Sequence, residues 1–148
     1  MKLPLFAAIA FIFLTPQTAF AEGDPEEGER LFLRCAGCHS IINDAGEELY
    51  PRGGITGPNL YNVFGRVAGT EPAYLNGDEL FSFNRYTDDM IAAGATGLVW
   101  SEETLADFVE NPIPYIREYL GDETARVNMS LRHPNGSDIA AYLRQFSN

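Results

Sequence analysis

The chain has 148 residues, of which 45% are hydrophobic and 21% are charged, and these values fit one folded domain and exclude wholesale disorder. Its formal charge of −11 argues against nucleic acid as a partner, because binding to phosphates needs a surplus of lysine and arginine. Two cysteines are too few for a disulfide scaffold or for a zinc site of four cysteines.

The N-terminal segment, residues 1–21, has the pattern of a secretory signal peptide. Lys2 supplies a positive charge, residues 5–14 are an uninterrupted apolar run, and Ala19–Ala21 has the form of a cleavage site. An apolar run of this length is too short to span a bilayer, which needs about 20 residues, and an uncleaved N-terminal anchor is the alternative interpretation. We therefore expect export to the periplasm, a mature domain over residues 22–148 and no membrane span after cleavage.

Three segments of the mature chain carry helical signals. The first begins at Asp24, an N-cap acceptor followed by proline, and the second begins at Ser101 and ends at Asn111-Pro112, because proline cannot continue a helix. The third runs from about Ser137 to Phe146 with one apolar stripe. No segment alternates with period two over strand length, and residues 40–57 form a glycine-marked loop. The sequence predicts an all-α domain whose long loops need a further group to pack against.

The sequence Cys35-Ala36-Gly37-Cys38-His39 matches the C-x-x-C-H pattern of a c-type haem attachment site. Two thiols at this spacing can add to the two vinyl groups of one porphyrin. The adjoining histidine then lies below the ring, where its imidazole can bind iron. The pattern therefore predicts one covalent haem c, held by Cys35 and Cys38, with His39 as an iron ligand.

Three other interpretations of these residues are weaker. A zinc site needs four ligands, and beyond these three residues only His133 or a carboxylate remains. A thioredoxin-like redox dithiol needs a βαβ context that the chain lacks. A disulfide between Cys35 and Cys38 would leave His39 without a role.

Further motifs along the chain resemble the soluble, single-haem class I cytochromes c of mitochondria and bacteria. The resemblance covers nearly all of the mature chain and includes Gly28–Cys35, Gly57–Leu60, Phe64–Arg66, Trp100–Tyr115 and Asp138–Leu143. These motifs look like the N-terminal helix, the two parts of the proximal loop, the stretch that leads to the distal ligand, and the C-terminal helix. The resemblance implies the class I cytochrome c fold, with a few helices and long loops wrapped around one covalently bound haem.

The resemblance also implies roles for residues outside the C-x-x-C-H pattern. The carbonyl of Pro58 is expected to accept the second ring N–H of His39 and to fix the orientation of the imidazole. Arg66, Tyr86 and Trp100 match positions whose side chains hydrogen-bond or neutralise the haem propionates, because buried carboxylates need such partners.

Three side chains are candidates for the sixth iron ligand. The resemblance points to Met129, which lies in the segment leading to the last helix, and a His/Met pair would raise the reduction potential. Met90 falls in an apolar stretch and is expected in the core, whereas His133 falls in a turn-like stretch and is expected on the surface. An open sixth position is the remaining alternative. One departure from the family is Phe108, which stands where a tyrosine hydroxyl often touches the axial sulfur.

The largest departure from the family is the charge. Members commonly dock on acidic partners through lysines around the haem edge, but cleavage would remove the only lysine and leave nine arginines against twenty-one acids, a charge of −12. Four arginines are candidates for a smaller basic patch: Arg34, Arg52, Arg126 and Arg132. We expect a redox partner with a basic or an apolar docking face. An acidic surface adapted to high salt is the alternative explanation.

The function that these features favour is a mobile, monomeric, periplasmic one-electron carrier without catalytic activity. Occupation of both axial positions by the protein would keep substrates from the iron, and no acid–base or nucleophile set is visible in the sequence. One alternative is a dedicated haem subunit or acceptor of a specific periplasmic dehydrogenase. A second is an enzyme or gas sensor with an open sixth position, which requires that Met129 does not bind iron.

Overall fold

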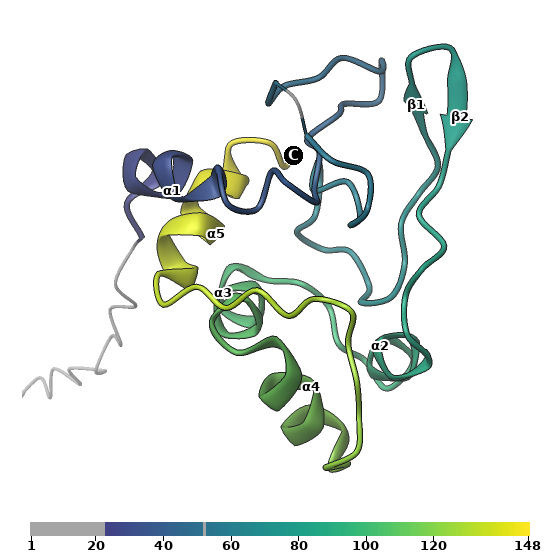
Figure 1. Cartoon of the computed structure of the whole chain (residues 1–148), viewed down its shortest axis with the longest axis vertical. Helices are drawn as coiled ribbons and strands as arrows, with labels where there is room; N and C mark the ends of the chain where they lie inside the picture. Colours follow the sequence, from purple (N-terminus) through teal and green to yellow (C-terminus); the bar gives the residue numbers. More distant parts are fainter. Residues whose placement is uncertain (1–22, 52) are drawn as a thin grey trace, which may run out of the picture.

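The computed structural model describes residues 23–51 and 53–148, so the predicted signal peptide lies outside the described residues. Five helices and one short hairpin are found in that part of the chain (Figure 1). In chain order they are α1 (Pro25–Phe32), β1 (Tyr74–Asn76), β2 (Glu79–Phe81), α2 (Asp88–Ala95), α3 (Glu102–Glu110), α4 (Pro112–Leu120) and α5 (Gly136–Arg144). No helix in the described ranges is long and apolar enough to cross a membrane.

The three predicted helices are confirmed as α1, α3 and α5, and side chains cap the first turns of α1 and α3. The Asp24 carboxylate accepts the amides of Glu26 (2.9 Å) and Glu27 (3.2 Å), which start α1. The Ser101 hydroxyl accepts the amide of Thr104 (3.1 Å), whose own hydroxyl accepts the amide of Ser101 (2.8 Å). Because these side chains satisfy amides that lack a partner within the helix, they define where α1 and α3 begin.

Two helices and the hairpin were not predicted. Pro112 ends α3, because proline has no amide hydrogen to continue the helix. It also occupies the first turn of α4, where a backbone amide would have no partner within the helix, so the next helix begins at once. The hydroxyl of Thr87 caps α2 by accepting the amide of Met90 (3.2 Å). Strands β1 and β2 are antiparallel, with Tyr74 opposite Phe81, and three residues each are too few for an alternating pattern to be recognised.

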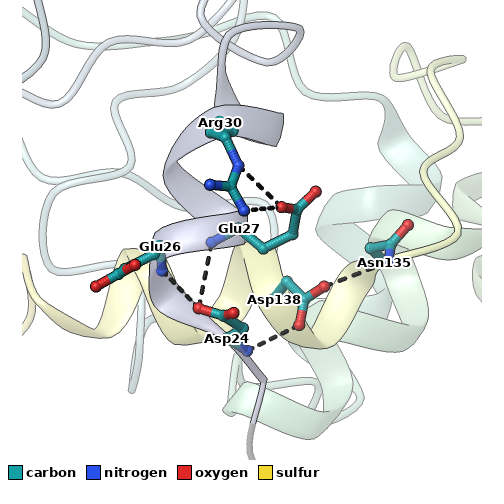
Figure 2. Close-up of polar contacts among 6 residues, drawn as sticks. All are labelled: Asp24, Glu26, Glu27, Arg30, Asn135 and Asp138. Carbon is teal, nitrogen blue, oxygen red and sulfur yellow. Dashed lines mark hydrogen bonds and ion pairs between the residues drawn. The ribbon is translucent and has the colours of Figure 1, made fainter.

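Helices α1 and α5 cross in close contact, and α3 also packs against α5 (Figure 1). Gly28 lies at the α1–α5 crossing, where a β-carbon would stand 2.0 Å from the carbonyl oxygen of Asp138. Figure 2 shows the polar contacts beside it: the amide of Asp24 donates to Oδ1 of Asp138 (2.8 Å), and Nδ2 of Asn135 donates to Oδ2 (3.3 Å). The rings of Phe32 and Tyr142 meet 5.4 Å apart at the same crossing. This crossing fixes the end of α1, from which the cysteine motif continues.

We predict that Gly28→Ala lowers the free energy of unfolding of the mature protein by at least about 2 kcal/mol, because a methyl group cannot fit between the two backbones. Chemical denaturation of the purified protein measures this change. Glu29→Ala is the control, since Glu29 is exposed on the same helix and its replacement should leave stability close to native. Equal stabilities of the two variants would contradict the close crossing.

Candidate functional site

A cavity of about 250 Å³ lies between the segment after α1, the loop around residue 58, helices α2 and α3, and the segment before α5. All the site residues predicted from the sequence line it: Cys35, Cys38, His39, Pro58, Arg66, Tyr86, Trp100 and Met129. The rest of the wall is mainly apolar, with Leu60, Val63, Met90, Leu105, Phe108 and Val109 among its members. The structure thus gathers residues from across the chain around one largely apolar space.

The cysteine motif continues the chain beyond α1 as a series of tight turns. The amide of Cys35 donates to the carbonyl of Phe32 (2.8 Å), and the amide of His39 donates to the carbonyl of Cys35 (3.0 Å). Cys35 is buried and Cys38 is exposed, and no disulfide joins them. Burial raises the pKa of the Cys35 thiol to about 11. The turns thereby bring two thiols and one imidazole to the same wall of the cavity.

The His39 ring is held by the loop that follows the motif. Its Nδ1 lies 2.8 Å from the carbonyl oxygen of Pro58. Burial lowers the pKa of His39, although the Pro58 carbonyl opposes this shift, and the neutral imidazole is therefore favoured. In that form Nδ1–H donates to Pro58, and Nε2 keeps its lone pair for a metal.

Gly57 leaves the space that the His39 ring occupies. A β-carbon at position 57 would lie 2.5 Å from Cε1, 2.7 Å from Nδ1 and 2.9 Å from Nε2 of the ring. The amide of Gly57 also donates to the carbonyl of Cys38 (2.7 Å), which holds the loop against the motif. A glycine is required here because the ring and the loop backbone are in direct contact.

The cavity is lined by the three residues expected at the propionates, Arg66, Tyr86 and Trp100. Arg66 and Tyr86 are held by hydrogen bonds to backbone carbonyls. Arg66 donates from Nη1 to the carbonyl of Asn59 (2.7 Å), and the Tyr86 hydroxyl donates to the carbonyl of Thr70 (3.1 Å). Burial raises the pKa of Tyr86 well above its usual value, so the phenol stays protonated. The Trp100 ring is buried and packs against an aromatic neighbour on α3.

The three sixth-ligand candidates differ in where the structure places them. Met129 is half-buried and lines the cavity, and Met90 is buried in the core, as expected, but also lines the cavity. The expectation of an exposed His133 was wrong, because this side chain is only 4% exposed. Its amide donates to the carbonyl of Val109 (3.0 Å), and its Nδ1 accepts the amide of Asn135 (3.3 Å). These backbone contacts draw the predicted turn inward, and His133 does not line the cavity.

The charges at the cavity differ in sign from the chain as a whole. Its charged lining residues are cationic, Arg34, Arg66 and Arg85, and no carboxylate among the described residues belongs to its wall. Of the predicted arginine patch, Arg34 lines the cavity, Arg126 and Arg132 do not, and Arg52 lies outside the described residues. The sequence interpretation missed Arg85, which lies in a loop without a recognisable motif.

Two further residues that the sequence interpretation did not single out organise this wall. The buried side chain of Asn59 accepts the amide of Ile42 (2.9 Å) and donates to the carbonyl of the same residue (2.7 Å). Glu71 accepts backbone amides from Asn59 and Phe83. Asn59 belongs to the motif at Gly57–Leu60, which was a signal for it, but nothing in the sequence around Glu71 marked that residue.

The donor set fits a haem group. Two thiols and an imidazole share one wall, a half-buried thioether lies on the same cavity, and the arginines can neutralise carboxylates. The described residues contain no group of three or more His, Cys, Asp or Glu side chains that could hold a metal ion.

Two known proteins and one solved structure, all cytochromes by name, are similar to this chain. The chain is 42% identical over 142 residues to cytochrome c-551 of Roseobacter denitrificans, covering 95% of this chain and 94% of that protein. It is 40% identical over 144 residues to cytochrome c2 of Rhodobacter capsulatus, covering 97% and 96%. The solved structure of cytochrome c2 from Rhodobacter capsulatus superimposes with a TM-score of 0.72 at 41% identity, covering 82% of this chain and 97% of that one. No protein-family model matches the chain.

We predict that Gly57→Ala displaces the His39 ring and weakens its hydrogen bond to Pro58, because the new methyl group would overlap the imidazole. The free energy of unfolding of the mature protein should fall by at least about 2 kcal/mol, and the ring N–H of His39 should exchange faster with solvent in NMR spectra. Pro58→Ala is the control, since it keeps the carbonyl acceptor. Native exchange of the ring N–H in Gly57→Ala would contradict this assignment.

Proposed function

The chain belongs to the class I cytochromes c, and from this premise we propose that it is a periplasmic one-electron carrier. Its haem is attached through Cys35 and Cys38, and His39 and Met129 bind the iron. The observation that carries this proposal is the gathering of those four side chains on a single, largely apolar cavity. Haem iron bound in this way supplies reversible one-electron chemistry between Fe(II) and Fe(III).

The residues on the His39 side orient the imidazole. The carbonyl of Pro58 accepts from Nδ1, so Nε2 faces the cavity with its lone pair available. Gly57 lets the ring lie flat against the loop. A histidine fixed in one tautomer and one orientation loses little freedom on binding iron.

Met129 is the side chain that we propose for the opposite axial position. Its thioether is half-buried on the cavity, whereas His133 is held by backbone contacts away from it. Met90 is fixed in the capped first turn of α2 and packs with the core. Phe108 lines the site and carries no hydroxyl, so it places an apolar ring there in place of a hydroxyl hydrogen-bond donor.

The polar side chains of the cavity suit the haem propionates. Arg66 presents a guanidinium from a half-buried position, and Tyr86 presents a protonated phenol. Trp100 is buried, lines the same cavity and carries an indole N–H donor. Carboxylates held by such groups stay ionised away from bulk water.

The same arrangement favours electron transfer without substrate chemistry. The charged residues that line the cavity are arginines, which do not act as general acids or bases at neutral pH. Ligation by both His39 and Met129 would leave the iron no site for a substrate. Electrons would then enter and leave on the side of Cys38, the exposed member of the cysteine pair.

We propose that the redox partner docks through a basic or an apolar face of its own surface. The mature charge of −12 attracts a basic partner over a distance, and the 70% exposed side chain of Leu33, beside Arg34, offers apolar contact near the cavity. The protein is proposed to act as a monomer.

We predict that Met129→Leu abolishes the sulfur-to-iron charge-transfer band in the visible spectrum of the oxidised protein, because leucine cannot bind iron. Met90→Leu makes the same substitution at the other methionine of the cavity and should retain the band. Absorption spectra of the two purified haem proteins make the comparison. A band that survives in Met129→Leu, or disappears in Met90→Leu, would show that the ligand assignment is wrong.

We predict that the mature charge governs encounters with small redox reagents. The rate of electron transfer with a cationic reagent, hexaammineruthenium, should fall as salt is added, because salt screens attraction to the acidic protein. The rate with anionic ferrocyanide should rise under the same conditions. Stopped-flow kinetics from low to high ionic strength measure both. Reversed slopes would mean that the arginines at the cavity control approach, and flat slopes would exclude electrostatic docking.

A further inference from the structure

Glu71 has a position that the proposed function does not explain. It lies on the chain between the loop that carries Pro58 and the hairpin, and its side chain is not part of the cavity wall. We propose that Glu71 is a positioning residue for the haem site, acting on His39 through the peptide group between Pro58 and Asn59. This inference rests on the proposed role of His39 as an iron ligand.

The geometry begins with the two oxygens of the Glu71 carboxylate. Oε1 accepts the amide of Asn59, and Oε2 accepts the amide of Phe83 at 2.7 Å. The two donors lie twelve residues before and twelve residues after Glu71. One half-buried carboxylate thus connects the proximal loop to the segment that returns from the hairpin and leads to Tyr86.

The Asn59 amide and the Pro58 carbonyl belong to one planar peptide group. Glu71 accepts from the N–H end of that group, and the C=O end accepts from Nδ1 of His39 at 2.8 Å. Because the peptide is rigid and planar, fixing its N–H also fixes the direction of its carbonyl. The chain of contacts therefore runs from Glu71, through one peptide bond, to the imidazole.

Charge passes along the same chain of contacts. A carboxylate at the N–H end polarises the peptide and makes its carbonyl a stronger acceptor, since consecutive hydrogen bonds reinforce one another. A stronger acceptor at Nδ1 makes His39 a more basic ligand, which favours Fe(III). Glu71 would thus lower the reduction potential both by its charge and through the peptide.

Three neighbours of Glu71 oppose the effect of burial on its carboxyl group. Burial raises the pKa of the carboxyl, whereas the amides of Phe83 and Asn59 and the nearby Arg66 oppose that rise. Tyr74 and Tyr86 also face it, and both have pKa values raised above the usual range, so they stay neutral. Arg66 supplies the positive charge and also donates to the carbonyl of Asn59 (2.7 Å).

The test compares Glu71→Gln with Glu79→Gln in the haem-loaded protein. Gln keeps the size of the side chain but places an amide donor where one oxygen accepts, so it removes the charge and breaks one of the two contacts. Glu79 is exposed on the hairpin that follows Glu71, and its replacement removes the same charge from a position that does not contact the amides of Asn59 and Phe83. Glu71→Ala removes both contacts, and Glu71→Gln serves alone if the alanine variant does not fold.

Three readouts are measured: amide exchange at Asn59 and Phe83 by NMR, exchange of the His39 ring N–H, and the midpoint potential. We expect exchange of at least one of the two amides and of the ring N–H to accelerate by about tenfold or more in Glu71→Gln, from the loss of one charge-assisted bond. The midpoint should rise more than in Glu79→Gln. Exchange and midpoint values equal to those of Glu79→Gln would overturn the proposal.

The same data separate this inference from the proposed function. Absence of the sulfur-to-iron band in the unsubstituted protein would contradict the ligation by Met129 but would leave the exchange test of Glu71 valid. Conversely, retention of the band in Glu71→Gln with unchanged exchange would overturn the role of Glu71 and leave the electron carrier intact.

Discussion

The hydrogen bond between Nδ1 of His39 and the carbonyl of Pro58 is the contact on which the rest of the site depends. It selects the neutral tautomer whose Nε2 faces the cavity, and it requires a glycine at position 57, because the ring occupies the space of a side chain. The loop that supplies the carbonyl is in turn held by Asn59 and Glu71. The hydrogen bond from His39 to Pro58 and the close approach of Gly57 to the ring thus hold this loop against the cysteine motif.

The second constraint is the separation of charge between the surface and the cavity. The chain carries an excess of eleven acidic over basic residues, yet the charged side chains that line the cavity are arginines. A group with carboxylates can be held at such a wall, while the acidic residues elsewhere set the charge that a partner would meet at a distance. The acidic character of this chain therefore lies outside the cavity, and we propose that it acts in docking.

The sequence was sufficient for placing the cysteine motif at a functional cavity and for the helices with strong end signals, because the C-x-x-C-H motif and an N-cap such as Asp24 are local patterns. Helix α4 and the hairpin were missed, since Pro112 signals both an end and a start and three-residue strands carry no periodicity. His133 was misplaced because its burial depends on backbone partners distant in sequence, such as Val109. Glu71 could not be found for the same reason, as its partners lie twelve residues away on either side.

The central claim is that the protein itself occupies both axial positions of the haem iron. A spectrally monitored redox titration of the mature haem protein, with carbon monoxide added to the reduced form, tests this most directly. The claim predicts a positive midpoint potential and no binding of carbon monoxide at neutral pH. A low midpoint with ready binding of carbon monoxide would contradict it, because Met129 would then not hold the iron.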